Sequence, residues 1–215
     1  MSTEPTVHLA DRLAQQYGIR VLNLPGLRRL ELHRVAEAVA DLATLMGGPR
    51  RFKSELRWVV VSRVPLTTRF AAMALPGVDV VYFEGASWDR PQELKWQTVH
   101  ELAHVWDIRR LFRLSRGLKQ VIRSRYGGFA WQLPIPLKYE PGKQWLKGRE
   151  PPLNSLEDWA DSVATYVYHE YAESLSLSQH GPRLISPARW YYVSRQMQVK
   201  LPYPSSWITR FTEAG

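Results

Sequence analysis

The spacing of apolar residues changes along the chain and predicts where helices and strands lie. Residues 27–46 carry Val35, Val39 and Leu42 at helical intervals, whereas residues 56–64 are a run of β-branched and aromatic residues typical of a strand. These two patterns predict helices at 8–17, 27–46, 93–111, 114–125, 155–172 and 187–199, an extended segment at 19–22, and strands at 56–64, 70–75 and 78–83.

Helices, then a small sheet, then more helices indicate an α+β fold. Pro76 and Gly77 predict a hairpin turn between the last two strands, so we expect a small, mostly antiparallel sheet. We expect residues 1–50 to form an N-terminal helical segment that packs on the same domain as residues 51–215. Residues 129–152 form a loop rich in Pro and Gly, and a loop of that length within a compact domain is usually functional.

The net positive charge of the chain comes from one segment. The 215 residues include 29 Lys and Arg against 20 Asp and Glu. Residues 109–149 hold eleven of these basic residues and one acid, Glu140, whereas the rest of the chain holds 18 basic and 19 acidic residues. Such a segment binds nucleic acid, an anionic surface or an acidic protein partner, or it only keeps the protein soluble.

Three absences from the sequence bear on where the protein works. No apolar run reaches the ~20 residues that a membrane span needs. The first residues lack the features of a secretory signal, and the chain has no cysteine. We therefore expect a cytoplasmic protein without a membrane span, although secretion by a leaderless route is compatible with the same features.

Residues 100–104 read His-Glu-Leu-Ala-His and lie inside the predicted helix 93–111. His100 and His104 are four residues apart, so their imidazoles lie on one helical face and can bind a single Zn²⁺. Glu101 lies beside them, where it can take a proton from a water that the metal activates. The alternative is a pair of structural histidines that form hydrogen bonds in the core.

A catalytic zinc needs a third protein ligand, and a second helix offers one. Glu157 and Asp161 also lie four residues apart, on one face of the predicted helix 155–172. We expect Glu157 to complete the zinc ligands and Asp161 to accept the N–H of a ligand histidine and fix its tautomer. Asp158 and Asp107 are rival ligands, although Asp107 is better placed to cap a helix end. Alternatively, the acids near residue 157 only complement the helix dipole.

The motifs HExxH at 100–104 and ExxxD at 157–161 resemble those of the gluzincin group of zincin metallopeptidases. Residues 99–107 (VHELAHVWD) and 157–167 (EDWADSVATYV) are most similar to the branch with the anthrax lethal-factor catalytic domain and the Mlc titration factor peptidases. The resemblance covers about residues 56–171. It implies a zinc-dependent peptidase.

The resemblance also implies a zincin-like catalytic domain over residues 51–215, with the basic stretch 109–149 as an insertion and a C-terminal helical part. In that family an edge strand of the sheet binds an extended peptide beside the metal. Residues 78–84 are the candidate for that strand by position, and they would bind the peptide by β-augmentation.

This chain departs from the branch at one catalytic position. Members carry a tyrosine about two helical turns before the glutamate ligand, where this chain has Glu150. An ionised glutamate cannot stabilise an oxyanion, so another group has to do so. We rank Tyr139 first among the candidates, ahead of Tyr126, Arg149 and His169. The alternative for His169 is a role in supporting the metal ligands or a place in the core.

Two functional hypotheses follow. The first is a zinc-dependent peptidase with His100, His104 and Glu157 as ligands and Glu101 as general base. Its substrate would be a protein or peptide, and an acidic one if the basic segment lines the cleft. The second is a non-catalytic zinc-binding module whose basic segment binds nucleic acid or an acidic protein partner. Salt separates them, because polyanion binding weakens steeply as the salt concentration rises.

Overall fold

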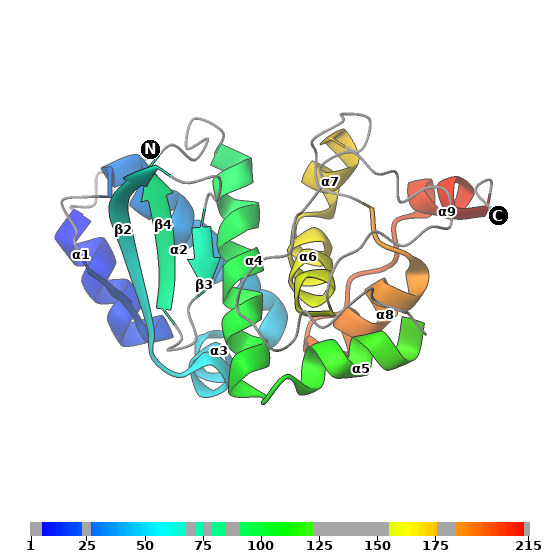
Figure 1. Cartoon of the computed structure of the whole chain (residues 1–215). Helices are drawn as coiled ribbons and strands as arrows, with labels where there is room; N and C mark the ends of the chain where they lie inside the picture. The colour runs from blue at the N-terminus through cyan, green and yellow to red at the C-terminus, as the bar shows by residue number, and fades with distance from the viewer. Residues whose placement is uncertain are drawn as a thin grey trace.

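The computed structural model describes residues 6–22, 27–67, 72–74, 79–84, 91–122, 155–175 and 184–212. The helix α4 (Pro91–Arg109) runs through the middle, with a sheet and helices on one side and only helices on the other (Figure 1). The remaining elements are α1 (Thr6–Arg12), the π-helical turn η1 (Leu13–Tyr17), β1 (Ile19–Val21), α2 (Arg29–Met46), α3 (Pro49–Leu56), β2 (Val59–Thr67), β3 (Ala72–Ala74), β4 (Asp79–Glu84), α5 (Arg113–Ile122), α6 (Ser155–Val167), α7 (His169–Leu175), α8 (Pro187–Gln196) and α9 (Ser205–Thr212). This mixture confirms the α+β class.

The predicted helices are present, but some of their limits differ. Pro49 begins α3, which the sequence did not predict, because proline suits the first turn of a helix as well as the end of the one before. The predicted helix 155–172 is two helices, since α6 ends before Tyr168 and α7 begins after it. The Pro- and Gly-rich loop 129–152 lies outside the described residues. Among the described helices, none is apolar over a length that could cross a membrane.

Helices α2 and α4 pack together and form the centre of the core. Most apolar residues of α2, including Val35 and Leu42, are buried in one cluster with Val99 of α4. At the edge of this contact Lys95 of α4 lies 3.0 Å from a carboxylate oxygen of Asp41 on α2. The packing holds α4 at a fixed place against the first half of the chain.

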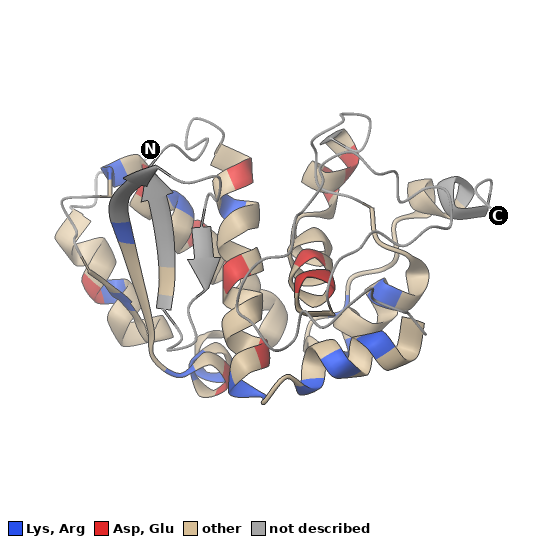
Figure 2. Cartoon of the chain, in the orientation of Figure 1, with Lys and Arg blue, Asp and Glu red and all other residues tan. Residues whose placement is uncertain are grey.

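The second half packs α5 and α8 against α6. Tyr192 of α8 donates a hydrogen bond to the carbonyl of Leu114 on α5, at 2.9 Å. The helix α5 passes so close to this side chain that a Cβ atom at Gly117 would lie 2.1 Å from the Tyr192 hydroxyl oxygen. The outward face of α5 carries Lys and Arg side chains (Figure 2).

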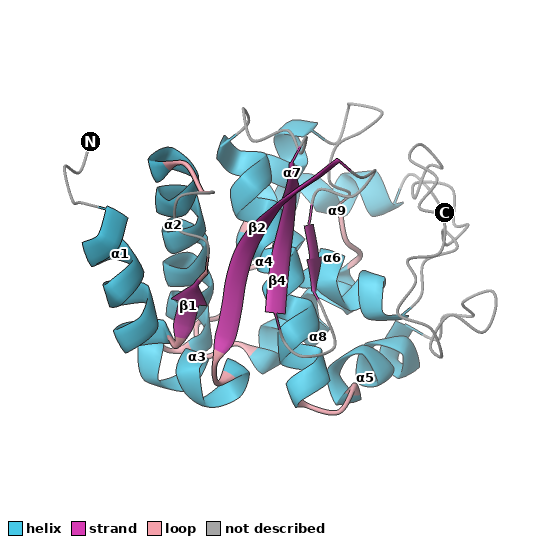
Figure 3. Ribbon diagram, turned by 60° about the vertical axis from the view of Figure 1, so that its left-hand side comes forward, coloured by secondary structure: helices cyan, strands magenta, loops and turns pink. Residues whose placement is uncertain are grey.

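The sheet has the strand order β1-β2-β4-β3, with α2 and α4 behind it in Figure 3. The predicted hairpin pair is confirmed, because β3 and β4 are antiparallel. The expectation of a mostly antiparallel sheet is wrong, because β1–β2 and β2–β4 are both parallel. After β3 the chain reverses and places β4 between β2 and β3, so β4 runs in the same direction as β2. The turn at residues 76–77 lies outside the described residues.

Two predictions about individual segments are affected by this topology. Residues 78–84 are not an edge strand, because β4 pairs with β2 on one side and β3 on the other. The edge strand next to α4 is β3 instead (Figure 1). The N-terminal segment contributes β1 to the sheet as well as helices, and residues 50 and 51 both lie within α3.

Candidate metal centre

The two histidines of the HExxH motif lie where α4 faces α6. His100 and His104 are one turn apart on α4, and their Nε2 atoms are 3.1 Å from each other. His100 is buried and His104 half-buried. At this distance at most one hydrogen atom fits between the two Nε2 atoms. Each ring therefore directs a potential ligand atom toward the same place.

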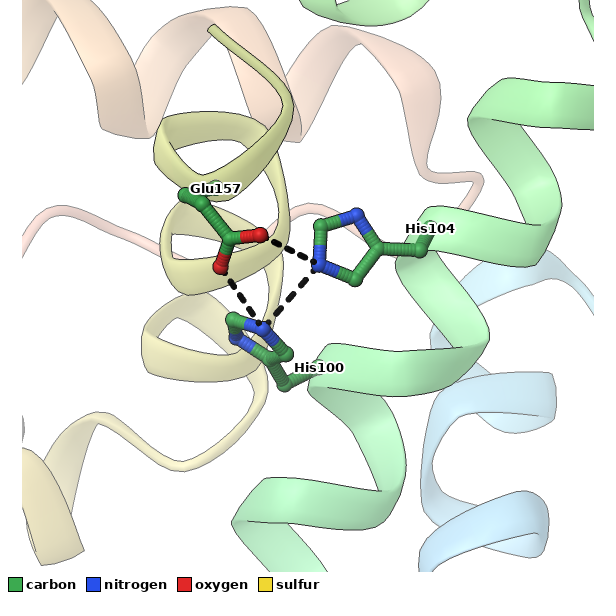
Figure 4. A group of neighbouring side chains, drawn as sticks. All are labelled: His100, His104 and Glu157. Carbon is green, nitrogen blue, oxygen red and sulfur yellow. Dashed lines mark hydrogen bonds and ion pairs between the residues drawn. The ribbon is translucent and has the colours of Figure 1, made fainter. Parts of the chain in front are cut away.

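Glu157 completes this group from α6, as Figure 4 shows. One carboxylate oxygen lies 3.3 Å from Nε2 of His100, and the other lies 3.4 Å from Nε2 of His104. The spacing of these residues along their helices is local, but the contacts of Glu157 with His104 and His100 span 53 and 57 positions of sequence. The structure therefore brings together the three residues predicted as metal ligands.

The same contacts control the charges of the group in the absence of a metal. Burial alone would lower the pKa of His100, but hydrogen bonding to Asp161 and Glu157 raises it well above its usual value. Burial would raise the pKa of Glu157, yet His104 and His100 lower it well below its usual value. A carboxylate held ionised beside two imidazoles is a site that favours a cation.

Asp161 occupies the position expected of a residue that orients a ligand histidine. Its Oδ1 atom lies 2.9 Å from Nδ1 of His100, one helical turn beyond Glu157 on α6. With the proton of the neutral ring on Nδ1, facing this carboxylate, the lone pair of Nε2 points toward His104 and Glu157. The contact therefore selects the tautomer that can bind a metal.

Glu101 is buried next to the histidines, with 3% of its surface exposed. Gln97, one turn earlier on α4, donates a hydrogen bond to Oε1 of Glu101 at 2.8 Å. The carboxylate lies close enough to His100 for its charge to raise the pKa of that ring. A carboxylate fixed beside a group that could hold a metal is the arrangement that general-base catalysis needs.

The two rival ligands have other partners. Asp107 accepts hydrogen bonds from the backbone N–H groups of Leu114 and Ser115, at 3.0 and 3.1 Å, and so caps the start of α5. Burial raises its pKa, although these bonds oppose the rise. Asp158 is buried in a two-pronged ion pair with Arg189 of α8, at 2.8 and 3.0 Å. Neither acid belongs to the group of potential metal ligands.

Trp159 is a residue of the centre whose role the sequence did not reveal. It is fully buried and donates its indole N–H to the carbonyl of Ala103 at 3.0 Å. That carbonyl lies between the two histidines along α4, and Trp159 lies two residues after Glu157 on α6. The bond ties the two ligand-bearing helices directly to each other. No sequence pattern could identify it, because the acceptor is a backbone carbonyl that every residue possesses.

The proposed oxyanion-stabilising residues lie mostly outside the described part of the chain. Tyr139, Tyr126 and Arg149 are all among the residues that are not described. His169 has an aromatic environment, since its ring centroid lies 5.6 Å from that of Trp190 in an edge-to-face contact. This places His169 beside the aromatic core of the second half.

Comparison of the chain with protein-family models, curated proteins and solved structures finds no match. We therefore test the fit of a metal on the donor atoms alone. Ligand atoms about 2.0–2.1 Å from a tetrahedral zinc ion are about 3.3 Å from one another. The two Nε2 atoms, 3.1 Å apart, are close to this value, and each of them lies 3.3 or 3.4 Å from a different oxygen of Glu157. Two imidazoles and one carboxylate also form a donor set that suits zinc.

Proposed function

We propose that the protein is a zinc-dependent peptidase. The observation that carries the proposal is the convergence of His100, His104 and Glu157, whose potential ligand atoms all lie within 4.8 Å of one another. Three protein ligands leave a fourth position open, which is the arrangement of catalytic rather than structural zinc sites. The carboxylate of Asp161 on His100 supports the same assignment.

The residues around His100, His104 and Glu157 have separate roles in this proposal. Zinc, when bound, supplies the Lewis acidity that polarises a peptide carbonyl and acidifies water. Glu101 accepts the proton of the attacking water and then gives it to the leaving amine. Gln97 holds one oxygen of Glu101, which limits the orientations of this carboxylate. Stabilisation of the oxyanion by Tyr139 stays a prediction from the sequence.

The sheet offers an edge next to α4 to which a peptide could add. The strand β3 is the edge of the sheet, and it lies between β4 and α4 (Figure 1). A peptide that adds to β3 would lie alongside the helix that bears His100 and His104. We therefore transfer the expected β-augmentation from residues 78–84 to residues 72–74. The α+β arrangement around α4 is compatible with the zincin-like domain that the sequence motifs imply.

Metal analysis tests the centre itself. Purified protein should hold about one zinc ion per chain after dialysis, and His100→Ala should hold much less. His33→Ala is the matched control, because His33 lies on α2 outside the metal-binding group. Absence of zinc from the wild type after loading and dialysis would refute the proposal.

A second experiment tests the chemistry separately from the metal. Glu101→Gln retains the shape of the side chain and its ability to accept a hydrogen bond from Gln97, but it cannot take up a proton. We expect this variant to bind zinc like the wild type and to lose at least about 100-fold in kcat on a mixed peptide library analysed by mass spectrometry. Equal rates for the two proteins would show that Glu101 is not the base.

A further inference from the structure

A basic surface that does not belong to the metal centre surrounds Trp58. This side chain is 47% exposed, although most tryptophans of the described chain are buried or half-buried. The Arg20 guanidinium carbon lies 4.6 Å from its ring centroid, and Nζ of Lys53 lies 4.9 Å from it. The contacts hold two cations against an aromatic ring that stays accessible to solvent.

The backbone beside Trp58 is held in an unusual conformation. Arg57 has φ 60° and ψ −135°, a backbone conformation that residues other than glycine rarely adopt. Arg109, at the end of α4, donates to the carbonyls of Leu56 and Trp58, at 3.2 and 3.1 Å. These bonds bracket the strained residue, so the turn displays Arg57 and Trp58 together at the surface. Strain that the surroundings maintain in this way is common at functional sites.

The basic surface continues onto α5. Arg113 and Arg116 lie nearly one turn apart on the exposed face of this helix. Leu111 and Phe112, which join α4 to α5, are both exposed and both have positive φ, at 53° and 59°. In Figure 2 the blue segments follow the lower edge of the molecule from α3 past the end of α4 to α5. We call Arg20, Lys53, Arg57, Arg109, Arg113 and Arg116 the basic strip.

Within the described part of the chain, the charge of the basic strip is not neutralised by acids. Among the described residues, no carboxylate lies within ion-pair distance of any member of the strip. Cations elsewhere do have such partners: Arg63 pairs with Glu31, and Lys95 pairs with Asp41. Neighbouring positive charges without acids repel one another, and binding of a polyanion would relieve that repulsion.

We propose that the basic strip binds single-stranded nucleic acid. A row of cations made mostly of arginine suits a chain of phosphates, because guanidinium groups bind phosphate through two parallel hydrogen bonds. The exposed rings of Trp58 and Phe112 lie among these cations, where unpaired bases can stack on them. An acidic peptide would satisfy the charges but would leave the rings without such partners.

This inference does not depend on zinc. No member of the basic strip belongs to the group formed by His100, His104 and Glu157. Nucleic-acid binding should therefore be unchanged after treatment with a chelator, whereas peptidase activity should be lost. Failure of one proposal leaves the other standing.

The binding experiment uses a fluorescein-labelled, single-stranded DNA of 20 nucleotides and fluorescence anisotropy between about 50 and 200 mM salt. If about five or six phosphates are contacted, the plot of log K against log salt should have a slope near −4. Arg113→Glu with Arg116→Glu should weaken binding at least tenfold and reduce the slope by about 1.4, the change expected for two lost contacts. Trp58→Leu should weaken binding about tenfold with the slope unchanged, because stacking does not release counterions.

Arg28→Glu is the control, since it reverses one positive charge at another exposed arginine. Arg28 precedes α2, whose 18 residues, about 27 Å in length, separate it from α3, the helix that carries Lys53 of the basic strip. This variant should bind like the wild type. Circular dichroism checks that each variant folds, and Arg113→Gln with Arg116→Gln replaces the charge reversal if that double variant does not.

Three outcomes would overturn the proposal. The first is no change in anisotropy at about 50 mM salt with micromolar protein. The second is equal binding by the wild type and the Arg113 and Arg116 variants. The third is preference for another polyanion. Stronger binding to phosphatidylserine vesicles would assign the strip to a lipid surface. Competition by poly-glutamate as effective as that by unlabelled oligonucleotide would assign it to an acidic protein.

Discussion

Replacement of Asp161 tests how the protein prepares His100 for a metal. The carboxylate oxygen lies 2.9 Å from Nδ1 of His100, and 21% of the Asp161 side chain is exposed. Asp161→Asn keeps an acceptor oxygen at nearly the same place but removes its negative charge. Asp161→Ala removes the acceptor as well. Neither change affects the three donor atoms directly, so any loss of zinc affinity reports on the support of the ligand.

The size of the effect follows from the strength of this contact. A hydrogen bond to a charged group contributes about 1.5–3 kcal/mol, and one between neutral groups about 0.5–1.5 kcal/mol. The difference of about 1–1.5 kcal/mol predicts a zinc affinity roughly tenfold lower for Asp161→Asn. Loss of the whole contact predicts a decrease of up to about 100-fold for Asp161→Ala, the range observed when partners of ligand histidines are removed.

Competition with a chromophoric chelator measures the dissociation constant for zinc in each variant. Glu170→Gln is the matched control, because it removes one negative charge from an exposed position on the neighbouring helix α7. It should bind zinc like the wild type. Thermal unfolding in the presence of a chelator verifies that the metal-free variants are folded, so that a loss of affinity is not a loss of structure.

The reasoning is refuted if Asp161→Ala binds zinc as tightly as the wild type while folding normally. That result would mean that the contact with Asp161 does not set the tautomer of His100. A decrease of the same size in Glu170→Gln would also refute it, because a general change of charge would then explain the loss.

Three further changes test the packing around the centre. Gly117→Ala should lower the free energy of unfolding by about 1–3 kcal/mol, because the added Cβ would clash with the Tyr192 hydroxyl. Urea denaturation measures this loss. Tyr192→Phe in the same chain should recover part of it. Asp158→Ala and Arg189→Ala should each cost about 3–5 kcal/mol, and together clearly less than their sum, since either alone leaves a buried charge unpaired. Zinc at about 100 times its dissociation constant should add about 2.7 kcal/mol to the free energy of unfolding, and a melting temperature insensitive to both zinc and chelator would contradict the proposed centre.

Local periodicity made the candidate ligands visible in the sequence. His100 and His104 are four residues apart in a strongly helical segment, and so are Glu157 and Asp161. Because a helix repeats every 3.6 residues, this spacing alone puts each pair on one face wherever the helix lies. The same reasoning predicted most helices and the antiparallel pairing of β3 with β4, since all of these depend on neighbouring residues.

The sequence could not show which acid of the second helix would meet the histidines. Glu157 and Asp158 differ by about 100° around α6, and the rotation of this helix decides between them. In the structure, Arg189 binds Asp158, while Trp159 donates to the carbonyl of Ala103. These contacts, which join positions far apart in the chain, turn Glu157 toward α4.

The strand order likewise depended on the whole fold. A run of β-branched residues predicts a strand, but it does not tell which strands will be its neighbours. The chain inserts β4 between β2 and β3 and adds β1 on the far side of β2, so that most of the pairing is parallel. Short-range geometry therefore determined the spacing of the candidate ligands. Long-range packing determined which of them meet and which strand forms the edge of the sheet, because contacts between distant residues leave no periodic trace in the sequence.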